Sequence, residues 1–147
     1  MATRNCVSPA RGRKSVSGQS NGVGGVATGW TWQCVEYAAR YYKAVYNLQI
    51  AGRSANTWYA NAAAKGLRAF PNGGTSRPRV GDILCSAYSD GHVAIVREVG
   101  PNFVKVIHQN WSNTTADDSK RLTLTVTGGK YTVQPAGRFS FQGWLRK

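Results

Sequence analysis

The chain has 147 residues, of which 41% are hydrophobic and 11% aromatic, so it holds enough apolar side chains for one globular domain and too many for a disordered chain. No run approaches the roughly 18 apolar residues of a membrane-spanning helix, and we expect no membrane span. Nineteen Lys and Arg against six Asp and Glu give a formal net charge of +13. This balance favours an anionic partner, and the few carboxylates argue against a glycosidase that needs two of them at one bond.

The three cysteines, Cys6, Cys34 and Cys85, form no CxxC pair, and the two histidines show no paired-ligand spacing. A structural zinc site is therefore not expected. An odd number of cysteines fits one reactive thiol together with a Cys6–Cys85 disulfide, and it also fits three free thiols in a reducing compartment. Both arrangements remain open at this stage.

Residues 1–29 are rich in Ser, Gly and Arg and show no hydrophobic periodicity, which predicts an irregular, basic N-terminal arm. The arm lacks the apolar core of about 7–15 residues that a secretory signal carries. We therefore expect either export by another route or removal of a signal that preceded this sequence.

Residues 30–46 predict a helix with Cys34 in its first turn. Apolar side chains recur at helical spacing, at Val35, Ala38, Ala39, Tyr42 and Tyr46. Unpaired N–H groups and the helix dipole at an N-terminus favour an anion and lower the pKa of a thiol, so Cys34 is a candidate nucleophile. The alternative is that Cys34 is a small buried hydrophobic side chain. Glu36 is expected on the solvent-exposed face of this helix.

A second helix is predicted from Ser54, a good N-cap residue, to Lys65, with Gly66 ending it. Residues 70–82 are dense in Pro and Gly, which predicts a loop. Turn-forming roles are expected for Gly81, Asp82 and Gly91.

The rest of the chain predicts a run of short strands, enriched in β-branched and aromatic residues and separated by turn residues. The predicted strands are Ile83–Ala87, His92–Val99, Phe103–His108, Arg121–Val126, Lys130–Val133 and Arg138–Leu145. Helices followed by antiparallel strands are typical of an α+β domain. We therefore assign residues 30–147 to a single domain.

Two of these strands carry a histidine at one end of an apolar row. Because side chains alternate between the faces of a strand, His92 shares a face with the apolar residues that follow it. On the next strand, His108 and Asn110 share a face with the apolar residues that precede them. The short turn between the strands makes them neighbours, so His92 and His108 are expected to lie close together, where the sheet meets a helix N-terminus.

A catalytic cysteine needs a base within hydrogen-bond reach, and the base needs an orienting partner. Cys34, His92 and either His108 or Asn110 are residues of these types. The segments that contain them resemble, in order, the motifs of CHAP domains, which are cysteine- and histidine-dependent amidohydrolases and peptidases. These segments are WQCVEYAARYY, PRVGDILCSAYSDGHVAIVREV and VKVIHQNW, within about residues 30–112.

The resemblance implies a papain-like α+β fold, with N-terminal helices packed on an antiparallel sheet of about five to six strands. It implies that Cys34 is the nucleophile and His92 the general base and acid. Many relatives have Glu, in an EQNW motif, where this chain has His108, so the third catalytic residue is either His108 or Asn110. Some relatives carry an acidic calcium loop before the cysteine. This chain is neutral and Gly-rich there, and we expect no metal and no cofactor.

The oxyanion is expected to be held by the backbone N–H of Cys34 together with one from Thr31 or Gln33. Aromatic side chains near the motifs are candidates either for a substrate cleft or for the core. They are Trp30, Trp32, Trp58 and Trp111.

The resemblance implies a peptidoglycan hydrolase, either an N-acetylmuramoyl-L-alanine amidase or an endopeptidase, that acts through a thioester. The expected partners are peptidoglycan and the anionic cell envelope, with no dedicated nucleic-acid role, and we expect a monomer that is secreted or delivered to the cell wall or periplasm. The alternative is a non-catalytic basic protein that binds the envelope or nucleic acid. A phage lysin, a wall-remodelling enzyme and an antibacterial effector all fit the sequence.

Overall fold

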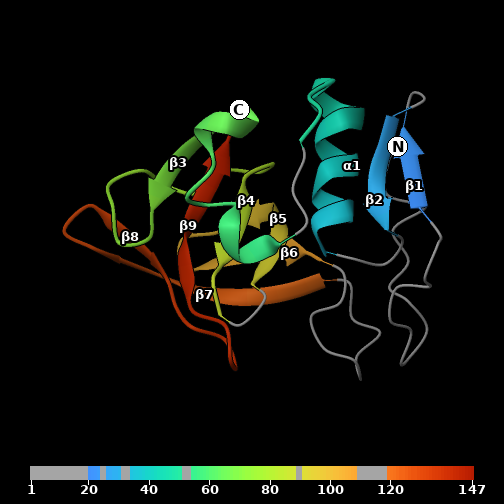
Figure 1. Cartoon of the computed structure of the whole chain (residues 1–147). Helices are drawn as coiled ribbons and strands as arrows, with labels where there is room; N and C mark the ends of the chain where they lie inside the picture. Colours follow the sequence, from blue (N-terminus) through green and yellow to red (C-terminus); the bar gives the residue numbers. More distant parts are fainter. Residues whose placement is uncertain (1–19, 24–25, 31–33, 51–53, 89–90, 109–118) are drawn as a thin grey trace.

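The computed structural model describes residues 20–23, 26–30, 34–50, 54–88, 91–108 and 119–147. In this part of the chain, Figure 1 shows one α-helix, α1 (Cys34–Tyr46), between a two-stranded hairpin and a larger sheet. The other elements are β1 (Ser20–Val23), β2 (Val26–Trp30), η2 (Ala55–Thr57), η3 (Ala63–Lys65), β3 (Arg68–Pro71), β4 (Ile83–Ser86), β5 (His92–Val99), β6 (Phe103–Ile107), β7 (Ser119–Thr127), β8 (Lys130–Val133) and β9 (Phe141–Arg146), where η marks a 3-10 helix.

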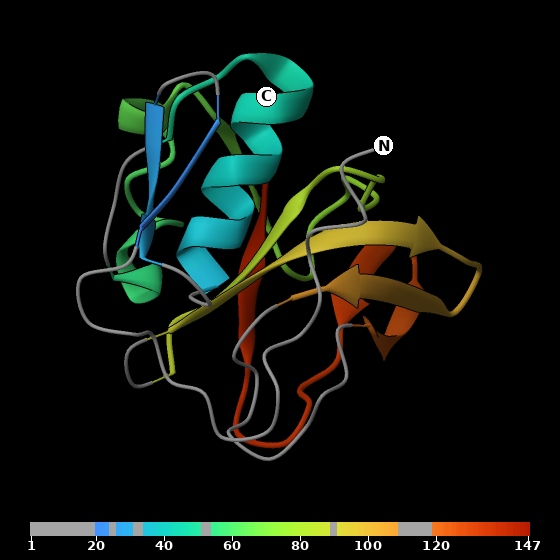
Figure 2. The ribbon, with the colours of Figure 1, turned by 90° about the vertical axis from the view of Figure 1, so that its right-hand side faces the viewer.

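The larger sheet has seven strands in the order β3-β9-β4-β5-β6-β7-β8, and every neighbouring pair is antiparallel. Figure 2 shows the sheet curling away from α1 toward β7 and β8. One helix on a curled antiparallel sheet agrees with the predicted α+β class. The prediction of several N-terminal helices is wrong for the described residues, where α1 is the one α-helix.

Helix α1 forms where the apolar periodicity predicts it, and it begins at Cys34 itself. The buried stripe of the helix includes Tyr37, Ala38 and Tyr42. At the other end Asn47 takes a left-handed φ of 52°, and its N–H donates to the carbonyl of Lys43 at 3.1 Å. This five-residue closure is the αL motif, so an asparagine ends the helix in the position that glycine usually occupies.

The central strands bury both faces of the sheet. One face packs against α1 through Ile83, Cys85, Val93, Ile95 and Leu145. The opposite face lines the concave side of the curl through Leu84, Ala94, Val96, Val104, Val106, Leu122, Leu124, Val133, Phe139 and Trp144. Successive residues of β4 and β5 therefore alternate between two hydrophobic cores, as strand geometry requires.

The predicted helix from Ser54 to Lys65 is wrong, because two separate 3-10 turns, η2 and η3, occupy this segment. Ser54 forms no side-chain cap; its carbonyl instead accepts a hydrogen bond from Thr57 Oγ1 at 2.8 Å. Asn61 Nδ2 donates to the Thr57 carbonyl at 3.0 Å, so side chains compete with the backbone pattern of an α-helix. The predicted end at Gly66 is confirmed, with φ of 72°.

Several strands also differ from the predictions. The arm of residues 1–29 was predicted to be irregular and the helix to start at residue 30, but residues 20–23 and 26–30 form the β1–β2 hairpin. Residues 68–71 form the edge strand β3, which pairs with β9 and raises the strand number to seven. Its terminal proline resembles a loop in sequence, but proline is tolerated at a sheet edge. The strand predicted from residue 138 begins at 141, because residues 136–139 form a tight turn.

A buried ion pair attaches the end of β9 to the start of β4. Asp82 is 1% exposed and accepts hydrogen bonds from Arg146 at 2.7 and 2.8 Å and from the backbone N–H of Arg79 at 2.8 Å. Asp82 therefore closes the predicted turn and also holds a strand far along the chain. Next to it, Tyr42 Oη donates to the Gly81 carbonyl at 2.6 Å and attaches α1 to the same turn.

Replacing Asp82 by Ala is expected to lower the free energy of unfolding by about 3 kcal/mol, because the mostly buried guanidinium of Arg146 loses its carboxylate. Urea denaturation of the full chain measures this loss. The matched control is Glu98→Ala, which breaks the more exposed pair with Lys105 and should change stability little. Equal effects of the two substitutions would contradict the structural role of the buried pair.

Candidate active site

Cys34 is the first residue of α1 and lies under the sheet, with 8% of its surface exposed. Burial raises the pKa of the Cys34 thiol, although hydrogen bonds from the backbone amides of Val93, Val35 and Cys34 itself act in the opposite direction. The expectation that the helix N-terminus alone would lower this pKa is therefore wrong. Desolvation of the thiolate outweighs the nearby N–H groups, and Cys34 is a protonated thiol in this structure.

His92 is the first residue of β5 and pairs in register with Ser86 of β4. The preceding Gly91 has φ of 80°, and a Cβ at this position would overlap the backbone of Ala55 and Asn56 in η2. Glycine is therefore required on both counts. The close approach fixes the turn before His92 against η2, and it places the imidazole at the start of β5, a central strand of the sheet.

The two histidines lie side by side, as the strand pattern predicts. The ring centroids of His92 and His108 are 5.6 Å apart at an interplanar angle of 70°, an edge-on arrangement. His108 directly follows β6, and both side chains are buried, with 3% and 2% exposed.

The strand faces are arranged differently from the expectation. Alternation places His92 on the face of Ala94 and Val96, which lines the concave core, whereas α1 covers the face that contains Val93. Cys34 and His92 therefore approach from opposite faces of β5, at the end of that strand. The amide of Val93, the residue after His92, is the link between them, because it hydrogen-bonds the Cys34 sulfur.

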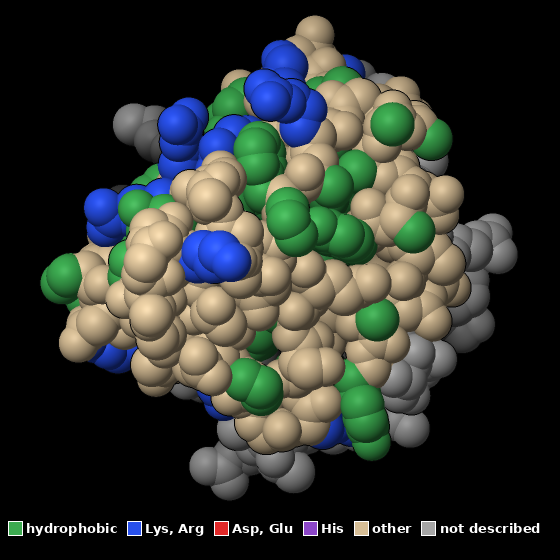
Figure 3. All heavy atoms as spheres, turned by 90° about the vertical axis from the view of Figure 1, so that its left-hand side faces the viewer, with side chains coloured by type: hydrophobic (Ala, Val, Ile, Leu, Met, Phe, Trp, Pro, Cys, Tyr) green, Lys and Arg blue, Asp and Glu red, His purple; other side chains and the backbone are tan. Residues whose placement is uncertain are grey.

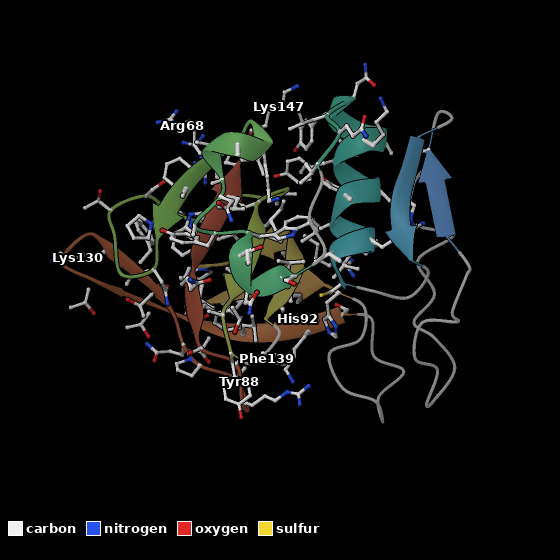
Figure 4. The ribbon with its side chains drawn as sticks, in the orientation of Figure 1. Arg68, Tyr88, His92, Lys130, Phe139 and Lys147 are labelled. Carbon is white, nitrogen blue, oxygen red and sulfur yellow. The ribbon has the colours of Figure 1, made fainter. Side chains whose placement is uncertain are left out.

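Two residues at this site were not identified from the sequence. The Phe139 ring lies 5.0 Å from the His92 ring at 33°, and the guanidinium carbon of Arg138 lies over the Phe139 ring, 5.1 Å from its centroid. Figure 4 shows His92 and Phe139 together. In the sequence, Arg138 and Phe139 look like the start of a strand, and only the turn that precedes β9 brings them to His92.

The surroundings keep His92 neutral. Burial lowers the pKa of His92 to about 3, with smaller contributions from the neighbouring His108 and from the positive charge of Arg138. At neutral pH the site therefore combines an uncharged thiol with an uncharged imidazole. A neutral imidazole can accept a proton, which is what a general base must do.

Several predicted site residues lie outside the described residues: Thr31, Gln33, Trp32, Asn110 and Trp111. The side chain of Trp30 is likewise not described. Trp58 is fully buried among core residues, with Lys65 Nζ 5.1 Å from its ring centroid, and it belongs to the core rather than to a cleft.

Glu36 was expected on the solvent-exposed face of α1, but it is fully buried. Its Oε1 accepts a hydrogen bond from Arg40 Nε at 2.9 Å, one helical turn later. The helical spacing of these two charges is visible in the sequence, but the hairpin that packs along α1 is not. This packing explains why a polar side of the helix is covered.

Cys85 is a free thiol that is fully buried beneath α1, and Cys6 lies outside the described residues. Within the described part of the chain no group of three or more His, Cys, Asp and Glu side chains is arranged to hold a metal ion. No helix among these residues is long and apolar enough to cross a membrane.

Comparison with known proteins agrees with the order of motifs. The sequence model of the CHAP domain matches residues 22–110, more than half of the chain. A comparison with curated proteins gave no match. The matched range includes α1 with Cys34, the strand that begins at His92, and His108. The chain belongs to the CHAP domain family, whose members are in general amidases and peptidases that act on cell-wall peptidoglycan.

Proposed function

We propose that the protein is a peptidoglycan hydrolase in which Cys34 is the nucleophile and His92 the general base and acid. One observation carries this proposal. Cys34, the first residue of α1, lies at the strand end that bears two neighbouring imidazoles, and the amide of Val93, the residue after His92, hydrogen-bonds the Cys34 sulfur. A helix headed by the nucleophile and packed on an antiparallel sheet supports a papain-like catalytic domain over residues 30–147. We further propose that this domain acts as a monomer.

The neutral state of both groups shapes the proposed chemistry. The Cys34 thiol gives its proton to His92 as the sulfur attacks the amide carbonyl, so no stable thiolate is needed beforehand. The resulting imidazolium protonates the departing amine and leaves a thioester on Cys34. His92, neutral again, then takes a proton from water, which hydrolyses the thioester and restores the thiol.

His108 is the third catalytic residue that the structure supports best. Its ring lies against His92 and is as deeply buried, so it can restrict the plane of the base. Asn110 remains the alternative. The developing oxyanion would be held by the Cys34 backbone N–H and a second N–H from Thr31 or Gln33.

Two bonds remain candidates: the amide between the sugar and the stem peptide, and a peptide bond within the stem or cross-bridge. Both are cleaved by the same thioester chemistry, so the residues at the site do not select between them. Mass spectrometry of the fragments released from purified peptidoglycan identifies the new end group and decides which bond is cut.

The charge of the protein supports an anionic envelope as its binding surface. Exposed cations without an ion-pair partner among the described residues include Arg68, Arg77, Arg79 and Lys147. The face shown in Figure 3 displays several Lys and Arg side chains and no Asp or Glu among its described residues. Arg68 and Lys147 lie at the end of the molecule away from His92 (Figure 4), so charge-based binding would leave the catalytic end accessible.

Replacing Cys34 by Ala is expected to abolish release of peptidoglycan fragments, because no thioester can form. The matched control is Cys85→Ala, which removes the other buried thiol beneath the same helix and should retain most activity in the folded protein. Turbidity loss of purified cell walls measures both, with circular dichroism as the check on folding. Full lysis by the Cys34 variant would exclude the proposed mechanism and favour a different catalytic group. Absence of lysis by the original protein, together with binding to walls, would favour the non-catalytic alternative.

The pH dependence of kcat/KM is expected to show an acid limb well below pH 6.5, the usual pKa of histidine. His92 is a base only when neutral, and its pKa is lowered to about 3, so activity persists as the pH falls toward that lowered value. Initial rates on a soluble muropeptide measure the profile. Half-maximal activity near pH 6.5 would show that the pKa of the catalytic base is not lowered by burial as it is for His92 in the structure.

Binding to intact walls is expected to weaken several-fold in a variant that carries both Arg68→Gln and Lys147→Gln, because these cations lose their attraction to wall phosphates. Sedimentation with walls, at low and high salt, measures the loss. Cleavage of a small uncharged muropeptide should stay the same, since these residues lie away from His92. If the double variant bound walls as tightly as the original protein at every salt concentration, charge at this end would have no part in binding.

A further inference from the structure

The ring of Phe139 joins His92 to an exposed cation. The rings of His92 and Phe139 are 5.0 Å apart, and the guanidinium carbon of Arg138 lies 5.1 Å from the Phe139 centroid. Phe139 is 4% exposed, whereas Arg138 is exposed. A positive charge is therefore held at the surface directly above the ring that covers the proposed catalytic base.

The turn that carries these residues is tightly closed. Ala136 and Phe139 exchange two backbone hydrogen bonds of 2.9 and 3.0 Å, and Gly137 takes φ of 57°. A positive φ is accessible to glycine at little cost. The turn directs Phe139 into the concave core and leaves Arg138 stacked above it, so the position of the cation is set by the backbone.

Arg138 has no carboxylate partner among the described residues. The carboxylates there are Glu36, Asp82 and Glu98, and their ion pairs are with Arg40, Arg146 and Lys105. A guanidinium that is held in place but lacks a counter-ion can bind an incoming carboxylate through two parallel hydrogen bonds.

We propose that Arg138 is a substrate-binding residue that takes a free carboxylate of the peptidoglycan stem peptide beside the amide to be cut, with Phe139 as the residue that positions it. This inference rests on the proposed function and names the part of the substrate that the site recognises. Stem peptides carry free carboxyl groups close to their amide bonds, so a cation beside the base distinguishes them from neutral peptides.

Carboxylate binding at Arg138 also affects the base. Among the described residues, the titratable and charged groups near His92 are His108 at the end of β6, Arg138 in the turn, and Cys34 on the other face of β5 beside Val93; Asp90, Asp117 and Asp118 lie outside the described residues. The positive charge of Arg138 lowers the pKa of His92. A bound carboxylate compensates this charge and makes His92 a stronger base. Binding of the acidic substrate thereby favours the proton transfer from Cys34.

The test compares soluble muropeptides whose stem-peptide carboxyl groups are free with the same compounds after amidation. The Arg138→Gln variant is expected to raise the KM for the muropeptides with free carboxyl groups roughly tenfold, because about one charge-assisted contact is lost. The KM for the amidated muropeptides should stay unchanged. The acid limb of kcat/KM should also move to higher pH, because His92 loses a neighbouring positive charge. Arg138→Lys should restore part of both effects, since it keeps the charge and loses the planar fork.

Arg121→Gln is the matched control. Arg121 lies on β7, and its guanidinium carbon lies 3.7 Å from the ring centroid of Phe103 on β6, so it has no contact with His92. This control should behave as the original protein in both assays. Equal losses by Arg138→Gln on free and amidated substrates, or no loss on either, would overturn the carboxylate site. If Cys34→Ala is inactive while Arg138→Gln shows no preference, only this inference fails and the proposed hydrolase remains.

Discussion

The packing of α1 on the β4–β5 face of the sheet is the contact on which the site depends. It buries Cys34 beside Val93, and because Val93 follows His92, the same contact places the proposed nucleophile one residue along the strand from the proposed base. Other features maintain this arrangement. The αL end at Asn47 stops the helix, the Tyr42 hydroxyl attaches it to the turn before β4, and the Asp82–Arg146 pair holds β9 beside β4. The geometry of the candidate site therefore depends on contacts spread over most of the domain.

Sequence reasoning recovered the features that depend on local pattern. The helix from Cys34, the strand from His92 and the closeness of the two histidines follow from apolar periodicity and a short turn, and the structure confirms them. Family membership followed from three ordered motifs. Local pattern was insufficient where packing and side-chain hydrogen bonds decide. The burial of Glu36 depends on the β1–β2 hairpin that packs along α1, and the broken helix after Ser54 depends on side chains that compete for backbone groups.

The placement of Phe139 and Arg138 shows the same limit at the site itself. Their sequence fits the start of a strand, and nothing in the local composition distinguishes it from the strand that begins at Phe141. Only the closed turn at Gly137 and the curl of the sheet bring them to His92, more than 40 residues earlier in the chain. The state of the proposed catalytic pair was also not predictable, because the balance between desolvation and N–H donors depends on how deeply the helix start is buried.

Burial of the uncharged Cys34 has a consequence for its sensitivity to oxidation. Oxidation of cysteine to sulfenic and higher acids proceeds through exposed thiolate. A thiol that is 8% exposed and has a raised pKa is a poor target for peroxides, so the proposed nucleophile is protected from oxidation. Burial of Cys34 thus lowers its intrinsic nucleophilicity and also makes it chemically durable.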